Sequence, residues 1–426
     1  MDIGRFFSLV ASLALVLVTG IATPANAASD IGKPGSRPDR IVLNAGTNVA
    51  TSQIITWRTS TKIKKGYVQI QVGNGNVRTV KQRKITTSRP SNKSYRALHH
   101  TATVWKLKPG TLYRYRVGVK GKRSPWRSFR TARNTQSWSL VSLGDTQLGS
   151  KAWLRTVVGR AFKGAPRASA IIQLGDIVEE PRKDNEWGNV FEAFRGRLWR
   201  INLFYTPGNH EQCLLKRCSA SSKTAYRAHF EFANNGVRGQ TQDWYYSDIN
   251  NARIVSLNSF GPLATQRAFL DKALATSKKT WNIVIFHAPV FSGAKNRVNT
   301  AMRNSWLPIL KKHDPDLVLN GHDHVYSRGH LVGEPDGTQY AIQVTSPKYY
   351  ETTAAASNDW TKNNAVREFK ASQTSTYQVI DFGKSTLRYR AVVAAKGANP
   401  STPLGIGKTL DEFTITKMAG APTTVD

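Results

Sequence analysis

Carboxylate, amide and imidazole side chains recur along this chain in short motifs. The motifs are Gly144-Asp145-Thr146-Gln147, Gly175-Asp176, Gly208-Asn209-His210-Glu211, His287-Ala288-Pro289 and Gly321-His322-Asp323-His324. Such oxygen and nitrogen donors are the groups with which proteins bind transition-metal ions. Together the motifs supply the ligand set of a centre that holds two metal ions.

Each motif directly follows a short apolar run that must position it. The five runs are Trp138–Leu143, Ala170–Leu174, Leu203–Pro207, Ile283–Phe286 and Leu317–Asn320. Short apolar runs bounded by Gly or polar residues are typical of buried strands. Open α/β sheets place their sites at the C-terminal ends of their strands. We therefore expect five strands to deliver these side chains to one site.

The order Asp, Asp, Asn-His, His, His-x-His resembles that of the calcineurin-like metallophosphoesterases, and within them that of the purple acid phosphatases. The resemblance covers residues 35–395, which is most of the chain. It implies a four-layer α/β/β/α sandwich and a dinuclear metal hydrolase. Phosphate esters resist attack because their anionic oxygens repel a nucleophile, and two metal ions offset that charge and activate water.

The resemblance also implies a role for each ligand. Asp176 would bridge the two metal ions, and Asp145 and His324 would complete one of the two sites. The ligands of the other site would be Asn209, His287 and His322. Because His322 and His324 are two residues apart, an extended segment would place them on one face, with Asp323 pointing away. The alternative for an Asp that follows a strand is a helix N-cap.

Further residues of the motifs are candidates for contact with the substrate. In the family, the histidine at the position of His210 contacts the phosphate or protonates the leaving group, and imidazole suits proton donation near neutral pH. Glu211 would orient His210. Tyr326 and Arg328 would line the pocket, where Arg328 would hold phosphate oxygens with two hydrogen bonds. The alternative role for Arg328 is a structural ion pair.

Two positions depart from the pattern of the purple enzymes. Glu179 stands where those enzymes have a tyrosine, three residues after the bridging Asp, so we expect little or no charge-transfer colour. Gln147 stands two residues after Asp145, where they have Gly and other metallophosphoesterases have His. Its carbonyl oxygen could bind a metal ion. Imidazole and carboxylate ligands suit Fe, Zn or Mn, and the identity of the pair stays open.

The hydropathy pattern divides the chain into two domains. Residues 40–133 contain short strand-like runs separated by turn residues, which is typical of an all-β sandwich. Leu107–Val117 resembles part of a fibronectin type III module, with Trp57 as the core tryptophan. Residues 134–418 alternate strand and helix patterns, which favours a catalytic α/β domain. The expected helices are Lys151–Phe162, Asn185–Leu198, Ser221–Ala233, Thr265–Ala275 and Met302–Lys312.

The remaining segments are expected to be flexible or to be removed. Residues 1–27 have a charged start, an apolar core and an A-x-A site, as in a secretory signal peptide. The apolar core is shorter than the roughly 20 residues of a membrane-spanning helix. We therefore expect a secreted or cell-wall-associated protein. Residues 28–39 are predicted to be a mobile arm, 351–372 a flexible insertion and 419–426 a disordered tail.

Cys213 and Cys218 are the only cysteines and lie just after the Asn-His motif. Outside the cytosol they could form a disulfide beside the site. The alternatives are two free thiols or a pair of metal ligands, although the ligand set is complete without sulfur.

The charge of the chain is large and uneven. The net charge is +34, and residues 31–133 carry 24 Lys and Arg against one acid, Asp39. Such a field attracts polyanions, for which cell-wall polymers, nucleic acid and anionic lipid are candidates. The alternative is a solvated surface that keeps the protein soluble. Two functions are therefore weighed: an exported phosphomonoesterase or phosphodiesterase, and an exported polyanion-binding protein with a vestigial hydrolase site.

Overall fold

The computed structural model describes residues 32–212, 221–236, 242–354 and 358–426. The expected signal peptide, residues 1–27, and the two cysteines, Cys213 and Cys218, lie outside the described residues. Within those four ranges, no helix combines the length and the apolar character that crossing a lipid bilayer requires.

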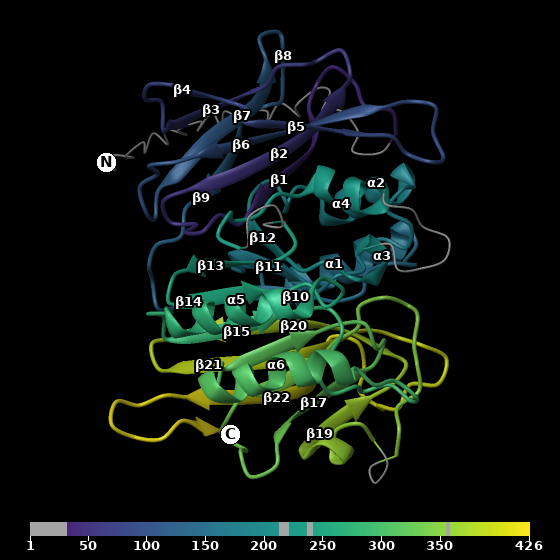
Figure 1. Cartoon of the computed structure of the whole chain (residues 1–426). Coiled ribbons are helices and arrows are strands. Elements are labelled where there is room, and N and C mark those ends of the chain that lie inside the picture. The colour runs from purple at the N-terminus through teal and green to yellow at the C-terminus, as the bar shows by residue number, and fades with distance from the viewer. Residues whose placement is uncertain (1–31, 213–220, 237–241, 355–357) are drawn as a thin grey trace, which may run out of the picture.

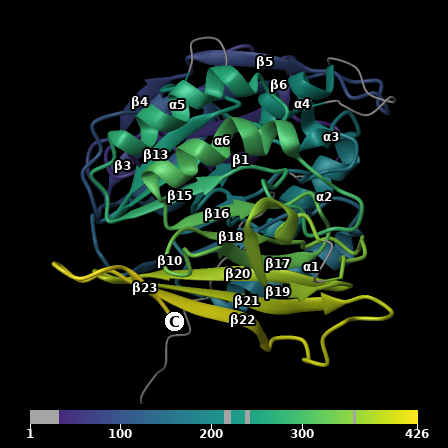
Figure 2. The ribbon, with the colours of Figure 1, turned by 60° about the horizontal axis from the view of Figure 1, so that its bottom comes forward.

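Two β-sheets pack face to face, and helices cover the outer face of each sheet (Figures 1 and 2). The larger sheet has the strand order β23-β22-β21-β20-β10-β11-β12-β1-β2-β6-β5, and the smaller has the order β13-β14-β15-β16-β18-β17-β19. The expected four-layer α/β/β/α sandwich is therefore confirmed.

The catalytic domain contributes seven strands to the larger sheet: β10 (Trp138–Leu143), β11 (Ala170–Gln173), β12 (Asn202–Tyr205), β20 (Thr374–Phe382), β21 (Thr386–Lys396), β22 (Thr409–Thr416) and β23 (Thr424–Val425). The smaller sheet consists of β13 (Tyr245–Ile249), β14 (Ala252–Ser256), β15 (Trp281–Ile285), β16 (Leu317–Asn320), β17 (Tyr326–Leu331), β18 (Gln339–Ile342) and β19 (Ala365–Ala371). The helices are α1 (Lys151–Gly164), α2 (Asp184–Phe194), α3 (Asn209–Gln212), α4 (Ser221–His229), α5 (Leu263–Ala275), α6 (Thr300–His313) and the short 3-10 turn η2 (Thr361–Asn363).

The core explains why the central strands are apolar on both faces. Ile172 of β11 and Ile254 of β14 lie in the layer between the two sheets. Leu154 of α1 packs on the outer face of the larger sheet, and Leu270 of α5 and Leu310 of α6 pack on the outer face of the smaller one. Strands buried on both faces have continuous apolar runs. This is the pattern that marked the strands before each motif.

The N-terminal module is a β-sandwich that packs against the catalytic domain (Figure 1). One layer comprises β1 (Asp39–Asn44), β2 (Gln53–Ser60), β5 (Lys84–Ser88) and β6 (Ala97–Val104), and it continues the larger sheet because β1 pairs with β12. The other layer comprises β3 (Tyr67–Val72), β4 (Arg78–Lys81), β7 (Leu112–Val119), β8 (Lys122–Arg123) and β9 (Arg127–Arg130). Trp57 is 1% exposed and stacks on His100, as expected of a core tryptophan.

The N-terminal arm is held in place over its described part, contrary to the expectation for residues 28–39. The carbonyl oxygen of Gly32 accepts a hydrogen bond from Arg58, and the carbonyl oxygen of Gly35 accepts one from the Ser60 backbone. Asp39 is buried as the first residue of β1. A Pro/Gly/Ser-rich composition does not predict such long-range contacts.

Two further expectations of flexibility are wrong. The end of the tail, Thr424–Val425, forms β23 and pairs with β22, so residues 419–426 are not wholly disordered. Residues 351–372 include β19, which pairs with β17 along most of its length. In both cases backbone hydrogen bonds to a neighbouring strand order the segment.

Candidate metal centre

The motif residues meet where the C-terminal ends of strands from both sheets come together. Asp145 and Gln147 follow β10, Asp176 follows β11, and Asn209 begins α3 after β12. From the smaller sheet, His287 follows β15, and His322 and His324 follow β16. The two sheets therefore each contribute one wall of the site, as the positions of the motifs predicted.

The ligand atoms lie within a few ångströms of one another. His287 Nε2 is 3.1 Å from Asp176 Oδ2 and 3.8 Å from Asp145 Oδ1. His324 Nε2 is 3.5 Å from Asp145 Oδ1. One ligand atom from each of Asp176, His287 and His322 lies within 4.8 Å of the other two. Residues separated by up to 179 positions thus converge on one small volume.

The backbone at the ligands adopts a conformation that most residues avoid. Asp145 and Asp176 both have φ of +48°, and His322 and His324 have φ of +71° and +51°. Left-handed φ is uncommon outside glycine and clusters at functional sites. The segment of the two histidines is therefore bent rather than extended, which corrects the expectation of a strand-like spacing. Asp323 nevertheless points away from the centre, as expected.

Glycines allow the loops to approach the ligands closely. A Cβ at Gly208 would collide with the carboxylate of Asp176, and one at Gly321 would collide with that of Asp145. The backbone N–H of His322 donates to Asp145 Oδ2 at 2.7 Å, a contact that this approach permits. The glycine of each motif is therefore part of the geometry that places the carboxylates.

Hydrogen bonds to the backbone orient two of the imidazoles. His287 Nδ1 donates to the carbonyl oxygen of Leu174 at 2.6 Å, and His324 Nδ1 donates to that of Lys348 at 2.9 Å. In both rings Nε2 is left facing the carboxylates. Metal-binding histidines are commonly fixed in this way through the nitrogen that does not bind the metal.

Within the described part of the chain, four buried polar atoms of the centre have no hydrogen-bond partner. These atoms are Asp145 Oδ1, Gln147 Oε1, Asn209 Oδ1 and His287 Nε2. Buried polar groups are nearly always satisfied, because leaving one unpaired costs about 1–3 kcal/mol. Carboxylate and amide oxygens and an imidazole nitrogen are the kinds of donor atom that transition-metal sites use. The residues present therefore fit bound metal ions.

The titration of the centre supports the same conclusion. Burial raises the pKa of Asp145 to about 7. Burial opposes protonation of His287, but the charges of Asp176 and Asp145 outweigh it and raise its pKa to about 10. Burial lowers the pKa of His324 to about 3 and that of His322 well below its ordinary value. The site thus favours a cation near its carboxylates, and two of its imidazoles are neutral, the form that binds metals.

The amide of Gln147 lies among the ligand atoms. Its Nε2 is 3.2 Å from Asp176 Oδ2 and 3.3 Å from His324 Nε2. Amide oxygen and nitrogen are assigned from their hydrogen bonds, and a half-turn of the amide would present Oε1 to the same atoms. The position suits a ligand, and the ligand role of Gln147 stays a prediction.

His210 lies beside the ligands without being one of the converging donors. Its Nδ1 donates to the carbonyl oxygen of Glu179 at 2.7 Å, and its Nε2 is 3.7 Å from Asp176 Oδ2. Burial would lower the pKa of His210, but the carboxylates of Asp176 and Glu179 outweigh it and raise the pKa. The raised pKa favours the protonated form of His210 at the edge of the centre.

Glu211 braces two loops and does not orient His210, which corrects the sequence-based expectation. Its carboxylate accepts hydrogen bonds from the backbone N–H groups of Asp176, Ile177 and Gly208 at 2.9, 3.0 and 2.9 Å. A carboxylate two residues after Asn209 thus ties the loop of the expected bridging Asp to the loop of the Asn ligand. Its position in the motif indicated that it lies near the site, but the sequence did not show which groups it contacts.

Tyr326 and Arg328 do not line the centre, contrary to expectation. The Tyr326 hydroxyl donates to Asp411 Oδ2 at 2.7 Å, and Arg328 Nε donates to the same oxygen at 2.7 Å. Arg328 also pairs with Glu368. Both side chains are buried along β17, where they join this strand to β22 and β19. The alternative role of Arg328 in a structural ion pair is therefore the observed one.

Arg297 is a residue near the centre that the sequence analysis missed. It donates to the carbonyl oxygen of His322 at 2.8 Å, and its guanidinium lies 4.6 Å from the ring centre of Tyr350. The Tyr350 ring is in turn 5.0 Å from that of His324. Arg297 lies in the loop before α6 and belongs to no motif, so no local pattern marked it. Its half-buried guanidinium also pairs with Asp323 at 3.4 Å.

Comparisons with known proteins agree with this geometry. Residues 38–131 match the family described as Purple acid Phosphatase, N-terminal domain, and residues 140–326 match the family described as Calcineurin-like phosphoesterase. The purple acid phosphatase of Glycine max is 24% identical over 70% of this chain and 67% of its own length. An uncharacterized protein of Mycobacterium tuberculosis is 24% identical over 72% of this chain.

The likeness extends to the fold. The structure of purple acid phosphatase PPD1 from yellow lupin seeds superposes with a TM-score of 0.72, covering 89% of this chain and 74% of that one at 15% identity. The chain spans 65% of the length of the mycobacterial relative.

Proposed function

This chain is a calcineurin-like phosphoesterase of the purple acid phosphatase type, and we propose from that premise that it hydrolyses phosphate esters at a dinuclear metal centre. The observation that carries the proposal is the set of four buried donor atoms that have no hydrogen-bond partner among the described residues. Asp176 is proposed as the bridging ligand, Asp145 and His324 as ligands of one ion, and Asn209, His287 and His322 as ligands of the other. When bound, the two ions would offset the charge of the phosphoryl group and supply an activated water.

A side chain of the protein would donate the proton that the leaving group takes up. His210 Nδ1 is fixed by the carbonyl oxygen of Glu179, so the ring presents Nε2 toward Asp176 and the centre. A protonated imidazole in this position can donate its proton to the oxygen of the departing alcohol. We propose His210 as the general acid and the residue that orients the phosphate.

A cavity of about 390 Å³ adjoins the centre and would receive the organic part of the substrate. Gln147, Glu179 and Lys183 contribute to its lining. Glu179 Oε2 is buried there without a hydrogen-bond partner, at the position where the purple enzymes have tyrosine. Because no tyrosinate follows the bridging Asp, we propose that the metal-loaded protein has little or no charge-transfer colour.

The test is hydrolysis of a phosphomonoester and a phosphodiester side by side. The full chain, loaded in turn with Fe, Zn or Mn, should hydrolyse p-nitrophenyl phosphate, bis(p-nitrophenyl) phosphate or both, and a chelator should abolish the activity. The ratio of the two rates would assign the substrate class. If no metal supports either reaction while the protein remains folded, the alternative of a polyanion-binding protein with a vestigial site is favoured.

We also propose that the basic module docks the protein on an anionic polymer outside the cell. Support comes from the composition of residues 1–27 and from the charge of residues 31–133. Lys62, Lys65 and Arg78 are exposed on turns and edges of the module. Counterion release makes such binding weaken steeply with salt. Retention of the full chain on cell-wall polymer, nucleic acid or anionic vesicles, measured at rising salt, should identify the partner. Salt-independent retention, or none, would leave the charge as a solvated surface.

A further inference from the structure

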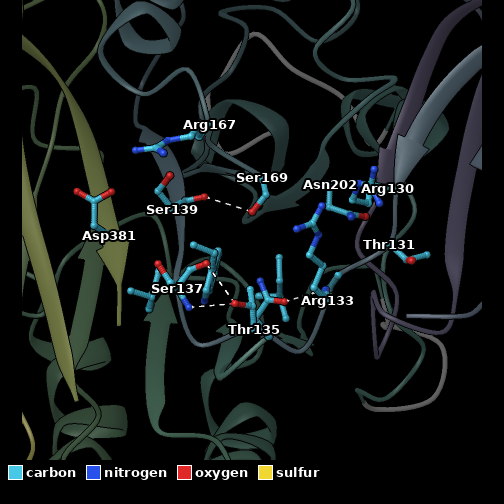
Figure 3. A pocket seen from close by; sticks show the side chains of 15 residues that line it. Arg130, Thr131, Arg133, Thr135, Ser137, Ser139, Arg167, Ser169, Asn202 and Asp381 are labelled. Carbon is cyan, nitrogen blue, oxygen red and sulfur yellow. Dashed lines mark hydrogen bonds between the residues drawn. The ribbon is translucent and has the colours of Figure 1, made fainter. Parts of the chain in front are cut away.

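A polar cavity of about 580 Å³ lies where the N-terminal module joins the catalytic domain, and we call it the junction pocket (Figure 3). Arg130 at the end of β9 and Arg133 in the connection to β10 form one wall. Arg167 and Ser169, in the loop before β11, and Asn202, the first residue of β12, belong to the catalytic domain. A ligand held here would touch both parts of the chain.

The junction pocket lies at the opposite end of the central strands from the metal centre. Ser169 immediately precedes β11, and Asp176 follows its other end. The extended chain between them spans roughly 20 Å at about 3.3 Å per residue. Neighbouring strands begin in register, since Ala170 pairs with Asn202. The pocket is therefore separate from the proposed hydrolytic site, and its residues take no part in that chemistry.

The pocket carries positive charge that no carboxylate of the described residues neutralises. Within the described part of the chain, Arg130, Arg133 and Arg167 form no ion pair with any carboxylate. Asp381 is the acid in the lining, and it pairs with Arg390 at 2.8 Å. Guanidinium groups bind phosphate oxygens with paired hydrogen bonds. Three such groups around one cavity favour a phosphorylated ligand.

A buried amide in the pocket has an unsatisfied acceptor. Asn202 is 5% exposed, yet its Oδ1 has no hydrogen-bond partner among the described residues. Figure 3 shows Asn202 and Arg133 on one side of the pocket, with Arg167 and Asp381 on the other. An orphaned acceptor beside arginines suits a ligand that brings a hydroxyl donor as well as a phosphate.

The remaining wall fits the carbon skeleton of such a ligand. Trp138 lines the pocket and is half-buried, with its ring stacked on Phe382 at 4.1 Å between centres. Aromatic rings present an apolar face that suits the C–H face of a sugar or polyol, while the hydroxyls of Thr135 and Ser137 lie in the same lining. We propose that the junction pocket binds a phosphorylated sugar or polyol, either free or as a unit of a polymer.

The test is binding of glucose 6-phosphate to the full chain, measured calorimetrically in an Asp176→Asn background so that the ligand is not hydrolysed. Glucose and inorganic phosphate form separate arms, and both should bind more weakly than the phosphosugar. Arg133→Gln with Arg167→Gln should weaken binding at least tenfold. The matched control, Arg78→Gln with Arg267→Gln, removes two exposed arginines outside the pocket and should change binding less than threefold.

Hydrogen exchange locates the site independently of these variants. The ligand should slow exchange of the backbone amides of residues 131–139, and the pocket variants should abolish this protection. Poly(glycerol phosphate), used in the same assay, would distinguish a polymer unit from a free ligand by its affinity. Equal losses in the pocket and control variants, or protection that falls outside the junction, would overturn the proposal. Hydrolysis of p-nitrophenyl phosphate by the pocket variants in the wild-type background should be unchanged.

Discussion

Two buried ionic clusters in this molecule use similar side chains in opposite ways. At the border between the module and the catalytic domain, Asp184 accepts hydrogen bonds from Arg40 at 2.7 Å, from Arg58 at 3.1 Å and from Tyr95 at 2.6 Å, and Asp39 pairs with Arg58. We call this the interface cluster. At the metal centre, by contrast, four polar atoms have no hydrogen-bond partner among the residues that the structure describes.

The two clusters differ in whether their buried charges are balanced by other side chains. In the interface cluster two arginines face two aspartates, so the charges balance without any outside ion. In the metal centre two carboxylates face imidazoles of which burial keeps two neutral. Removing charges from water costs several kcal/mol per ion unless a partner compensates. The first cluster finds its partners in the protein, and the donor atoms of the second fit bound metal ions.

The largest expected effect on stability comes from breaking the interface cluster. Asp184→Asn leaves Arg40 and Arg58 with one carboxylate in a buried site, so the free energy of unfolding in urea should fall by about 3–5 kcal/mol. Metal content should be unchanged. The control, Asp271→Asn, breaks solvent-screened pairs with Lys312 and His313 and should cost far less than the loss of Asp184. Equal losses would mean that burial does not distinguish the two pairs.

His210 tests whether a residue beside the metal centre contributes to catalysis without binding a metal ion. Because it contacts Asp176 and Glu179 but is not one of the proposed ligands, His210→Ala should lower kcat by about 10²–10⁴-fold, with metal content intact. The loss should be smaller for a phosphoester with a good leaving group, which needs little protonation. The same loss for good and poor leaving groups would assign His210 to phosphate binding instead.

A variant of Gln147 tests whether its amide oxygen is one of the metal ligands. If its amide oxygen is a ligand, Gln147→Ala should weaken binding of one metal ion by about 10–100-fold, measured by competition with a chelator. Gln147→His, which introduces the residue of other metallophosphoesterases, should restore affinity. An alanine variant with unchanged metal affinity would show that the side chain only fills space.

The smallest effect has the opposite sign to that of Asp184→Asn. In metal-free protein, Asp145→Asn removes the charge from a buried carboxylate whose Oδ1 has no hydrogen-bond partner. The free energy of unfolding should therefore rise by about 1 kcal/mol. Metal-loaded protein should show no such gain, since a ligand is lost. A clear loss of stability in the metal-free variant would place Asp145 among structural carboxylates like Asp184.

The sequence predicted the strands and their motifs because both signals are local. A strand buried on both faces is a continuous apolar run, and the ligands follow each run within a few residues. Partners that are distant along the chain were not predictable. Arg328 was expected to bind substrate, but it pairs with Asp411, 83 residues away. The prediction of a disordered tail was wrong for a different reason, because the short run Thr424–Val425 gave no strand pattern of its own and pairs with β22.

Charge likewise indicated a region but not the contacts within it. The excess of Lys and Arg in residues 31–133 marked an unusual module. It did not show that Arg40 and Arg58 are buried against Asp184 of the catalytic domain, or that Arg133 lines a pocket with Arg167. Composition does not show whether a charged side chain is exposed to solvent or buried.

The most direct test of the central claim is the metal content of Asp176→Asn, measured by elemental analysis together with phosphoesterase activity. Wild-type protein should hold two metal ions per chain. The variant should lose at least one ion and the activity, because the proposed bridging carboxylate joins both sites. Asp381→Asn, at the opposite end of the strands, is the control and should retain both ions. An Asp176→Asn protein with two metal ions and full activity would contradict the account.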